Sequence, residues 1–289
     1  MSMYANSLPV PVYAPPRLRF DPFWWLGEIG ARQPVLACTG FLIGLAIIPM
    51  AFAGVLDPRF FNGIDVWIKP IKFATAIFLY LLTLAFFAGW VARKDRQKWW
   101  FNAAVWIVAA AAIFEIAYIA FQASQAQASH FNRADAVHIA LYAAMGMGAT
   151  LMVAFSGLLG FLIRRNRTLN VAPAIRDSAV LGLILTFVST MVVAGTLSAS
   201  GSHWIGGAHS DAGGMILTGW ARDGGDLRVA HLFATHAMHF IPLFGVASAY
   251  ISGSGNRRPV WLFSAAYAGF IAFLYFQALA GQPFLGFIK

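Results

Sequence analysis

The residues best suited to chemistry are three histidines and one glutamate embedded in apolar sequence. His231, His236 and His239 lie in the segment HLFATHAMH, and Glu115 lies in FEIAYIAFQ. At about 100° per residue, the three imidazoles fall within an arc of about 140° on one helix. Imidazole and carboxylate groups are ligands that iron, zinc and copper accept. The sequence therefore predicts a metal site formed by His231, His236, His239 and Glu115.

Two other polar residues extend this prediction. A b-type haem needs axial ligands on two helices at the same depth, and His138 and His231 meet that condition. Lys72, in WIKPIKF, lies at a depth similar to that of Glu115, so an ion pair between them is expected. As catalytic groups, Glu115 would accept a proton and Lys72 would tune it or bind an anionic group. The structural alternative is a salt bridge that only joins two helices.

Three functions are open at this point. The first is a membrane metalloprotein, such as an oxidoreductase that depends on iron, zinc, copper or b-type haem. The second is a transporter or receptor that holds a small anionic ligand at the external face, with proton coupling through Glu115 and the histidines. The third is a structural or assembly subunit whose polar groups only connect helices. Cys38 is the single cysteine, which excludes a four-cysteine iron–sulfur cluster.

Composition identifies the elements that must position these residues. Hydrophobic residues make up 60% of the 289 residues and charged residues only 11%, with a mean hydropathy of +0.69. A soluble domain is about 25% charged. The chain is therefore expected to be an integral membrane protein whose main partner is the lipid bilayer. The net charge of +9 is interpreted as membrane topology, not as nucleic-acid binding. The sequence indicates no oligomeric state.

Seven apolar runs are long enough to cross a bilayer, which predicts an all-α polytopic protein with a seven-helix bundle. Residues 1–33 form a separate N-terminal segment, expected at the cytoplasmic lipid interface and unlike a cleaved signal peptide. Residues 34–289 form the transmembrane domain. Its predicted spans are 34–56, 67–92, 100–122, 137–163, 177–199, 229–252 and 259–280.

The basic residues indicate the orientation of the bundle. Thirteen of the twenty Lys and Arg residues fall in four segments that seven spans place on one side. The positive-inside rule then predicts a cytoplasmic N-terminus and an external, periplasmic C-terminus, in a bacterial inner membrane. The long glycine-rich loop 200–228 would lie outside as an ordered cap over the span 229–252, with Asp226 capping the helix that follows.

Helix packing signals complete the prediction. Pro242 cannot donate a backbone hydrogen bond, so a kink is expected beside His239. Small residues let helices approach closely in lipid. Such contacts are predicted for the pairs Gly40 and Gly44, Gly146 and Gly148, and Gly157 and Gly160.

Overall fold

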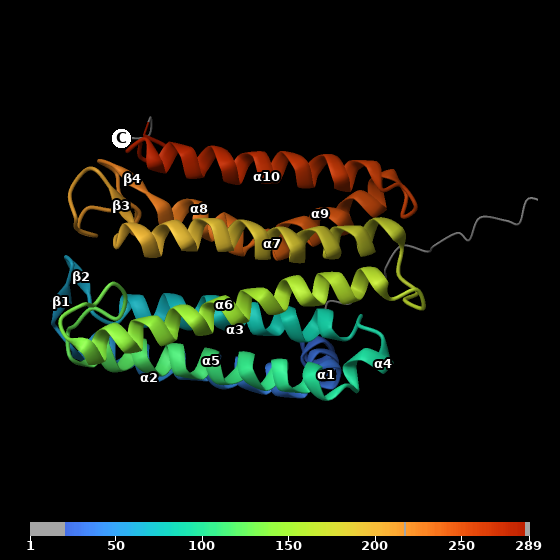
Figure 1. Ribbon diagram of the computed structural model, residues 1–289, viewed down its shortest axis with the longest axis horizontal. Coiled ribbons are helices and arrows are strands. Elements are labelled where there is room, and N and C mark those ends of the chain that lie inside the picture. The colour runs from blue at the N-terminus through green and yellow to red at the C-terminus, as the bar shows by residue number, and fades with distance from the viewer. Residues whose placement is uncertain (1–20, 217, 287–289) are drawn as a thin grey trace, which may run out of the picture.

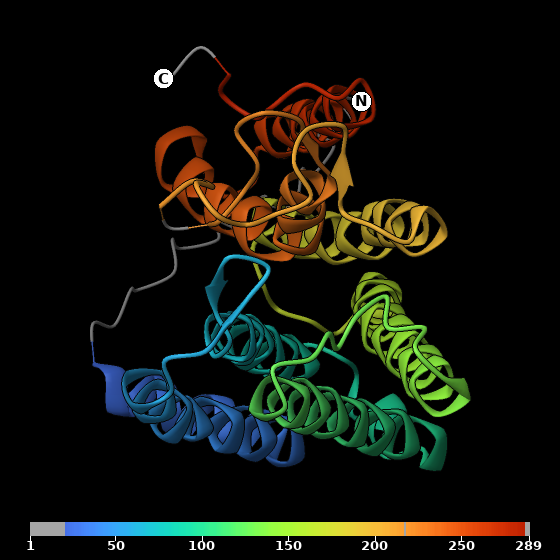
Figure 2. The same cartoon turned by 90° about the vertical axis from the view of Figure 1, so that its left-hand side faces the viewer.

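The computed structural model describes residues 21–216 and 218–286, so most of the predicted N-terminal segment 1–33 lies outside the described residues. The described chain is mainly helical, and its long helices lie side by side along the longest axis (Figure 1). Figure 2, which views them end on, shows two groups of helices. The first group consists of α1 (Pro22–Arg32), α2 (Pro34–Leu56), α3 (Ile68–Ala88), α4 (Arg93–Arg96), α5 (Trp99–Ser124) and α6 (Ala136–Arg165).

The second group has its own apolar core. It consists of α7 (Pro173–Ser200), α8 (Leu227–Thr235), α9 (Ala237–Ser252) and α10 (Arg258–Leu279). Its buried cluster includes Val193, Ala234, Ile241 and Leu274. The larger cluster of the first group also takes in Leu183 of α7, so α7 joins the two groups by packing on α6.

The helices bear out a membrane-embedded helical bundle. Six of the described helices are long and apolar enough to cross a membrane, and the α8–α9 pair passes the same test when taken together. The helix bounds follow the predicted spans closely, and α2 has the predicted bounds 34–56. The chain is therefore an integral membrane protein in contact with lipid.

The span 229–252 is broken, but not beside His239, where Pro242 led us to expect a kink. The axes of α8 and α9 meet at a bend of 50°, and the break lies at His236. Pro242 instead lies inside α9. The amide of Met238, near the start of α9, donates to Thr186 Oγ1 of α7 at 2.9 Å. A neighbouring helix thus satisfies backbone groups that the break exposes, which is how lipid-embedded helices tolerate interruptions.

Glycines allow close helix contacts at five of the six predicted positions. A Cβ at Gly40 or Gly44 would meet α3 side chains, and one at Gly157 or Gly160 would meet α7. Gly148 faces Ala111 of α5, whereas a Cβ at Gly146 would meet nothing within 4 Å. The structure adds Gly245, where a Cβ would collide with Ser178 and so block the contact between α9 and α7.

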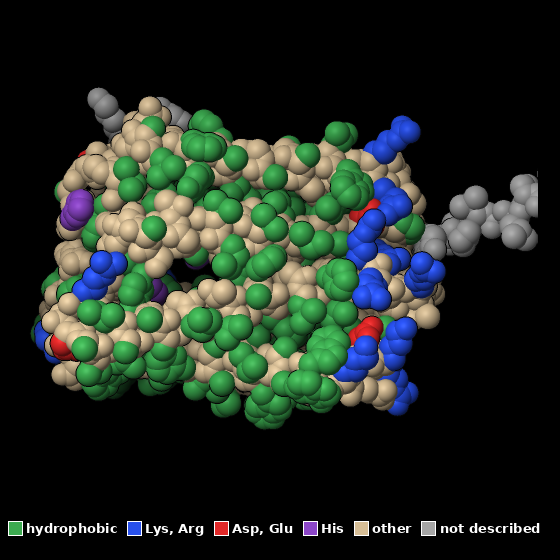
Figure 3. Space-filling view, in the orientation of Figure 1, with side chains coloured by type: hydrophobic (Ala, Val, Ile, Leu, Met, Phe, Trp, Pro, Cys, Tyr) green, Lys and Arg blue, Asp and Glu red, His purple; other side chains and the backbone are tan. Residues whose placement is uncertain are grey.

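The two ends of the bundle differ in charge. One end, here the basic end, carries α4, the α6–α7 turn and the α9–α10 turn. Figure 3 shows Lys and Arg gathered there. The opposite end, here the loop end, carries two short hairpins. They pair β1 (Phe60–Phe61) with β2 (Ile64–Asp65), and β3 (Trp204–Ile205) with β4 (Gly225–Asp226).

The two hairpin segments contact each other across the loop end. Asn62 and Gly63 form the β1–β2 turn with φ of 51° and 83°, as an Asn-Gly turn favours. The carbonyl of Asn62 accepts hydrogen bonds from the Asp211 amide at 2.9 Å and from Ser210 Oγ at 3.2 Å. The loop before α8 is therefore tied to the first helix group.

Candidate functional site

The candidate site lies at the loop end, where α3 and α5 of the first group face α8 of the second. Lys69, His130 and His231 are each half-buried, and they lie within electrostatic reach of one another. These polar side chains are therefore neither packed in the core nor fully exposed to solvent. We call the region bounded by Lys69, Glu115, His130 and His231 the polar hollow. At the same end, Figure 3 shows an opening between α6 and α7 with histidine atoms at its edge.

Two lysines enter the site from the first turns of α3. Lys69 has no hydrogen bond or ion pair with any described residue, and its ammonium lies 5.9 Å from the Phe73 ring centre. Lys72, one turn later, donates to the carbonyl of Thr218 at 3.0 Å. Lys72 therefore anchors the loop, while Lys69 faces the hollow. A charged group without a partner at membrane depth is a strong indication of function.

Glu115 approaches the same hollow from α5. It is 6% exposed, and its Oε2 atom has no hydrogen-bond partner among the described residues. The hydroxyl of Tyr118, on the next turn, is also without one. The predicted ion pair between Glu115 and Lys72 is not formed, because Lys72 turns toward Thr218. Lys69 is the lysine within electrostatic reach of Glu115.

His130 belongs to the site but was missed from the sequence. It lies in the connection between α5 and α6, where its Nδ1 is 3.1 Å from Ser129 Oγ and its ring packs on Phe73 at 5.1 Å. Burial, reinforced by Lys69 and by the neighbouring histidines, holds the pKa of His130 well below its ordinary 6.5. The sequence signal was weak, since a single histidine between spans is usually exposed to solvent.

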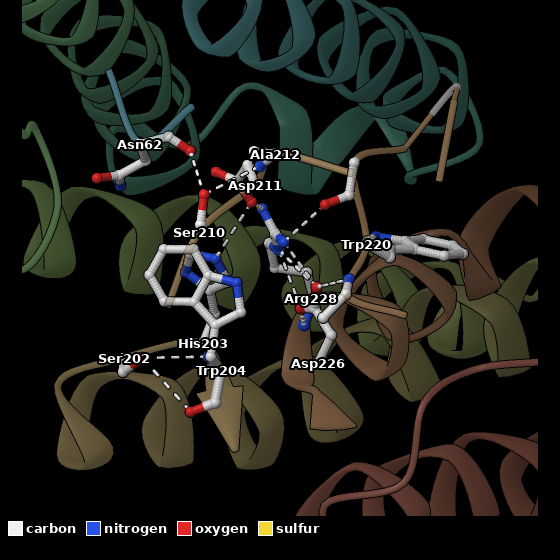
Figure 4. Close-up of polar contacts among 12 residues, drawn as sticks. Asn62, Ser202, His203, Trp204, Ser210, Asp211, Ala212, Trp220, Asp226 and Arg228 are labelled. Carbon is white, nitrogen blue, oxygen red and sulfur yellow. Dashed lines mark hydrogen bonds and ion pairs between the residues drawn. The ribbon is translucent and has the colours of Figure 1, made fainter. Parts of the chain in front are cut away.

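A network of ion pairs fastens the loop 200–226 over α8 (Figure 4). Arg228 of α8 contacts Asp211 at 2.7 Å and Asp226 at 2.6 Å. Asp226 also accepts from the Arg228 amide, which confirms its predicted role as the cap of this helix. His203 Nε2 lies 3.7 Å from Asp211, and its ring lies 3.8 Å from that of Trp204. The loop thus forms an ordered cover at this end.

Burial and neighbouring charges both shift the pKa values of Asp211 and His203 in the covering loop. Burial alone would raise the pKa of Asp211, but the contacts with His203 and Arg228 outweigh it and lower the pKa below the ordinary 3.8. Burial lowers the pKa of His203 from 6.5 despite the nearby carboxylates. The folded loop therefore holds an ionised aspartate beside a neutral imidazole near neutral pH.

The histidines predicted as metal ligands are only partly brought together. The rings of His236 and His239 lie 4.9 Å apart at the helix break. His239 Nε2 is 2.9 Å from Thr83 Oγ1, while its Nδ1 and that of His231 have no hydrogen-bond partner among the described residues. Within the described residues, no group of three or more His, Cys, Asp or Glu is placed to hold a metal ion. The predicted set of three histidines with Glu115 is thus not assembled as one cluster.

His138, the other predicted haem ligand, is engaged locally. Its Nδ1 lies 2.8 Å from Asp135 Oδ2, and Asp135 also caps the start of α6 by accepting from the His138 amide. No polar or ring contact joins His138 to His231 in the part of the chain that the structure describes. The geometry gives no support to a haem held between these two histidines.

Comparison with known proteins identified no similar protein. No protein-family model matches the chain, and no curated protein or solved structure matches it either. The interpretation of the site therefore depends on its own residues.

Proposed function

We propose that this protein is a membrane receptor or transporter that binds a small monoanion in the polar hollow together with one proton. The observation that carries the proposal is the ammonium of Lys69, a half-buried side chain that has no hydrogen-bond acceptor or ion-pair partner among the described residues. An anion supplies such an acceptor, and a buried ammonium without one is costly.

The charges around the hollow support binding of an anion that is coupled to uptake of a proton. Arg228 is matched by Asp211 and Asp226 through direct ion pairs. These two carboxylates exceed the charge of Arg228 by one, and with the carboxylate of Glu115 they balance the charges of Lys69 and Lys72. When Glu115 takes up a proton, one cation is left uncompensated, and a monoanion restores neutrality. His130 and His231 add imidazoles that can donate or accept a hydrogen bond with the ligand.

The positions of the charged residues also set the proposed orientation. The basic end carries most of the Lys and Arg and is placed in the cytoplasm by the positive-inside rule. The loop end then faces the periplasm of a bacterium, with the protein in the inner membrane. The ligand would enter under the loop 200–226.

The test is anion binding by the purified full-length protein in chloride-free buffer. Acetate, lactate, nitrate and phosphate are titrated by calorimetry at several pH values, and a pH indicator measures proton uptake. We expect saturable binding of a monoanion with about one proton taken up, and at least tenfold weaker binding in Lys69→Met. Lys98→Met, which breaks a surface ion pair with Asp95 at the basic end, is the matched control. Absence of binding by every anion would reject the proposal.

Uptake into proteoliposomes separates the two forms of the proposal. A transporter accumulates the labelled anion when a proton gradient is applied, whereas a receptor binds it without uptake. In either case Glu115→Gln is expected to remove the pH dependence, because glutamine cannot take up the proton.

A metal- or haem-dependent oxidoreductase is the second candidate, favoured by the close approach of the His236 and His239 rings. Metal analysis and a visible spectrum of the purified protein test it directly. Stoichiometric iron, zinc, copper or haem that is lost in the His236→Ala, His239→Ala double variant would support this candidate. His209→Ala, at an exposed loop histidine, is the control. Metal-free, colourless protein that binds an anion would exclude it.

A further inference from the structure

The basic end contains a pocket that the proposed function does not use. It is open and has a volume of 590 Å³, and its lining residues are Arg164, Arg257, Arg258, Trp261 and Leu262. We call it the arginine pocket. It lies where the end of α6 meets the α9–α10 turn and the first turns of α10, on the part of the surface where Figure 3 shows basic side chains.

Asp177 organises one side of this pocket. The carboxylate of Asp177, buried at the start of α7, accepts from Arg257 Nε at 2.7 Å and from Arg257 Nη2 at 2.9 Å. It also accepts from the indole N–H of Trp261 at 3.0 Å. This arrangement fixes the Arg257 guanidinium and the Trp261 ring as rigid parts of the pocket wall.

The remaining charge of the pocket is positive. Asp177 compensates Arg257, but the guanidinium groups of Arg164 and Arg258 have no carboxylate partner among the described residues. Both side chains belong to exposed residues. Two uncompensated guanidinium groups beside a fixed third one form a binding site for phosphate oxygens, which arginine contacts through paired N–H groups.

The apolar part of the pocket faces lipid. Leu262 is 72% exposed and Trp261 is 48% exposed, and both lie on the first turns of the membrane-spanning helix α10. Tryptophan is enriched at the level of the lipid headgroups. A ligand in this pocket would therefore contact arginines at one end and the hydrocarbon boundary at the other.

We infer that the arginine pocket binds the phosphate groups of an anionic phospholipid at the basic end of the bundle. Basic pockets between transmembrane helices are a known mode of recognition for such headgroups. Two free arginines match the two phosphates of a cardiolipin better than the single phosphate of phosphatidylglycerol. The soluble alternative that shares this chemistry is free phosphate.

The experiment measures thermal unfolding of the delipidated full-length protein during titration with cardiolipin, phosphatidylglycerol, phosphatidylcholine or inorganic phosphate. We expect saturable stabilisation by cardiolipin, a weaker effect of phosphatidylglycerol and none of phosphatidylcholine. The Arg164→Gln, Arg258→Gln variant should bind cardiolipin at least about tenfold more weakly, because it loses the direct, charge-assisted contacts with the phosphates.

The control variant is Arg93→Gln, Lys94→Gln, which removes the same charge from α4 at the same end. It is expected to keep cardiolipin affinity within about twofold of the unmodified protein, because α4 does not line the pocket. An equal loss in both variants would show general surface attraction and overturn the site. Equal stabilisation by inorganic phosphate without lipid would overturn the lipid assignment in favour of a soluble phosphate ligand.

Discussion

The hydroxyl of Thr186 on α7 accepts a hydrogen bond from the amide of Met238 on α9 at 2.9 Å. The same hydroxyl lies 3.5 Å from the carbonyl of Thr235 at the end of α8. One threonine therefore bridges the break between the two half-helices. A hydrocarbon environment offers these backbone groups no water as a substitute partner.

Thr186→Val is expected to destabilise the protein. Valine keeps the shape but leaves the buried Met238 amide without a partner, which costs about 1–3 kcal/mol. Thr190→Val is the matched control, because Thr190 is buried one turn further along α7 and its hydroxyl has no hydrogen-bond partner in the described part of the chain. Its stability should be unchanged or higher. Denaturant unfolding in mixed micelles measures both, and equal losses would contradict the bridging role.

The helices could be predicted from sequence because hydropathy adds up over about 20 residues. The predicted span 34–56 has the same bounds as α2, and the others differ by a few residues. The break at His236 could not be predicted in the same way. It depends on Thr186 and Gly182 of α7, which contact the break from another helix. Pro242 was the visible local signal, and it lies inside α9.

The sequence indicated most of the residues of the site but not the interactions among them. Counting residues along each helix matched Lys72 with Glu115 in depth, whereas in the structure Lys69 is the lysine within electrostatic reach of Glu115. The depth of a residue does not determine on which side of the helix it lies. The sequence therefore predicted Lys72 as the partner of Glu115, whereas Lys69 is the lysine that faces the hollow. His130 was missed because it comes from a connection between spans, whose path depends on tertiary contacts with Phe73 and Tyr142.

The orientation of the bundle in the membrane can be tested with reporter fusions. We expect seven crossings, with α8 and α9 counted as one span, and therefore expect residues 21 and 286 on opposite sides of the membrane. A phosphatase reporter fused after residue 286 should be active in the periplasm. A reporter in the α6–α7 turn at 166–172 should be inactive there, because that turn belongs to the basic end. A C-terminal fusion that is produced but inactive would contradict seven crossings.

Acid should loosen the loop end. The folded-state pKa values of His130 and His203 lie below the ordinary 6.5, because burial disfavours their charged forms. The unfolded or undocked loops therefore bind more protons below about pH 6.5. The free energy that stabilises the docked loops is therefore at its full value above that pH. It decreases as the pH falls toward the folded-state pKa values of the two histidines. The lowered pKa of Asp211 extends the loss below its ordinary 3.8.

Hydrogen exchange of the segments 125–135 and 200–226 measures this loosening. Exchange should accelerate between pH 6.5 and 5 after correction for the intrinsic rate. The groups that face His203 are Asp211, Asp226 and Arg228, so His203→Gln should weaken the pH dependence of the loop 200–226. His209→Gln is the control at an exposed position of the same loop. A pH-independent exchange pattern would show that neither imidazole controls docking.

The partnership of Lys69 and Glu115 can be measured by a double-mutant cycle. The two side chains form no direct ion pair in the described residues but lie within electrostatic reach, so Lys69→Met or Glu115→Gln alone should remove this attraction and lower the stability. The double variant removes both charges and should recover at least about 1 kcal/mol of the summed loss. Lys72→Met provides the control, because Lys72 donates to Thr218 and should combine additively with Glu115→Gln. Additive losses would show that Lys69 and Glu115 do not interact, and coupling of Glu115 to Lys72 would instead support the pair that helix depth predicted.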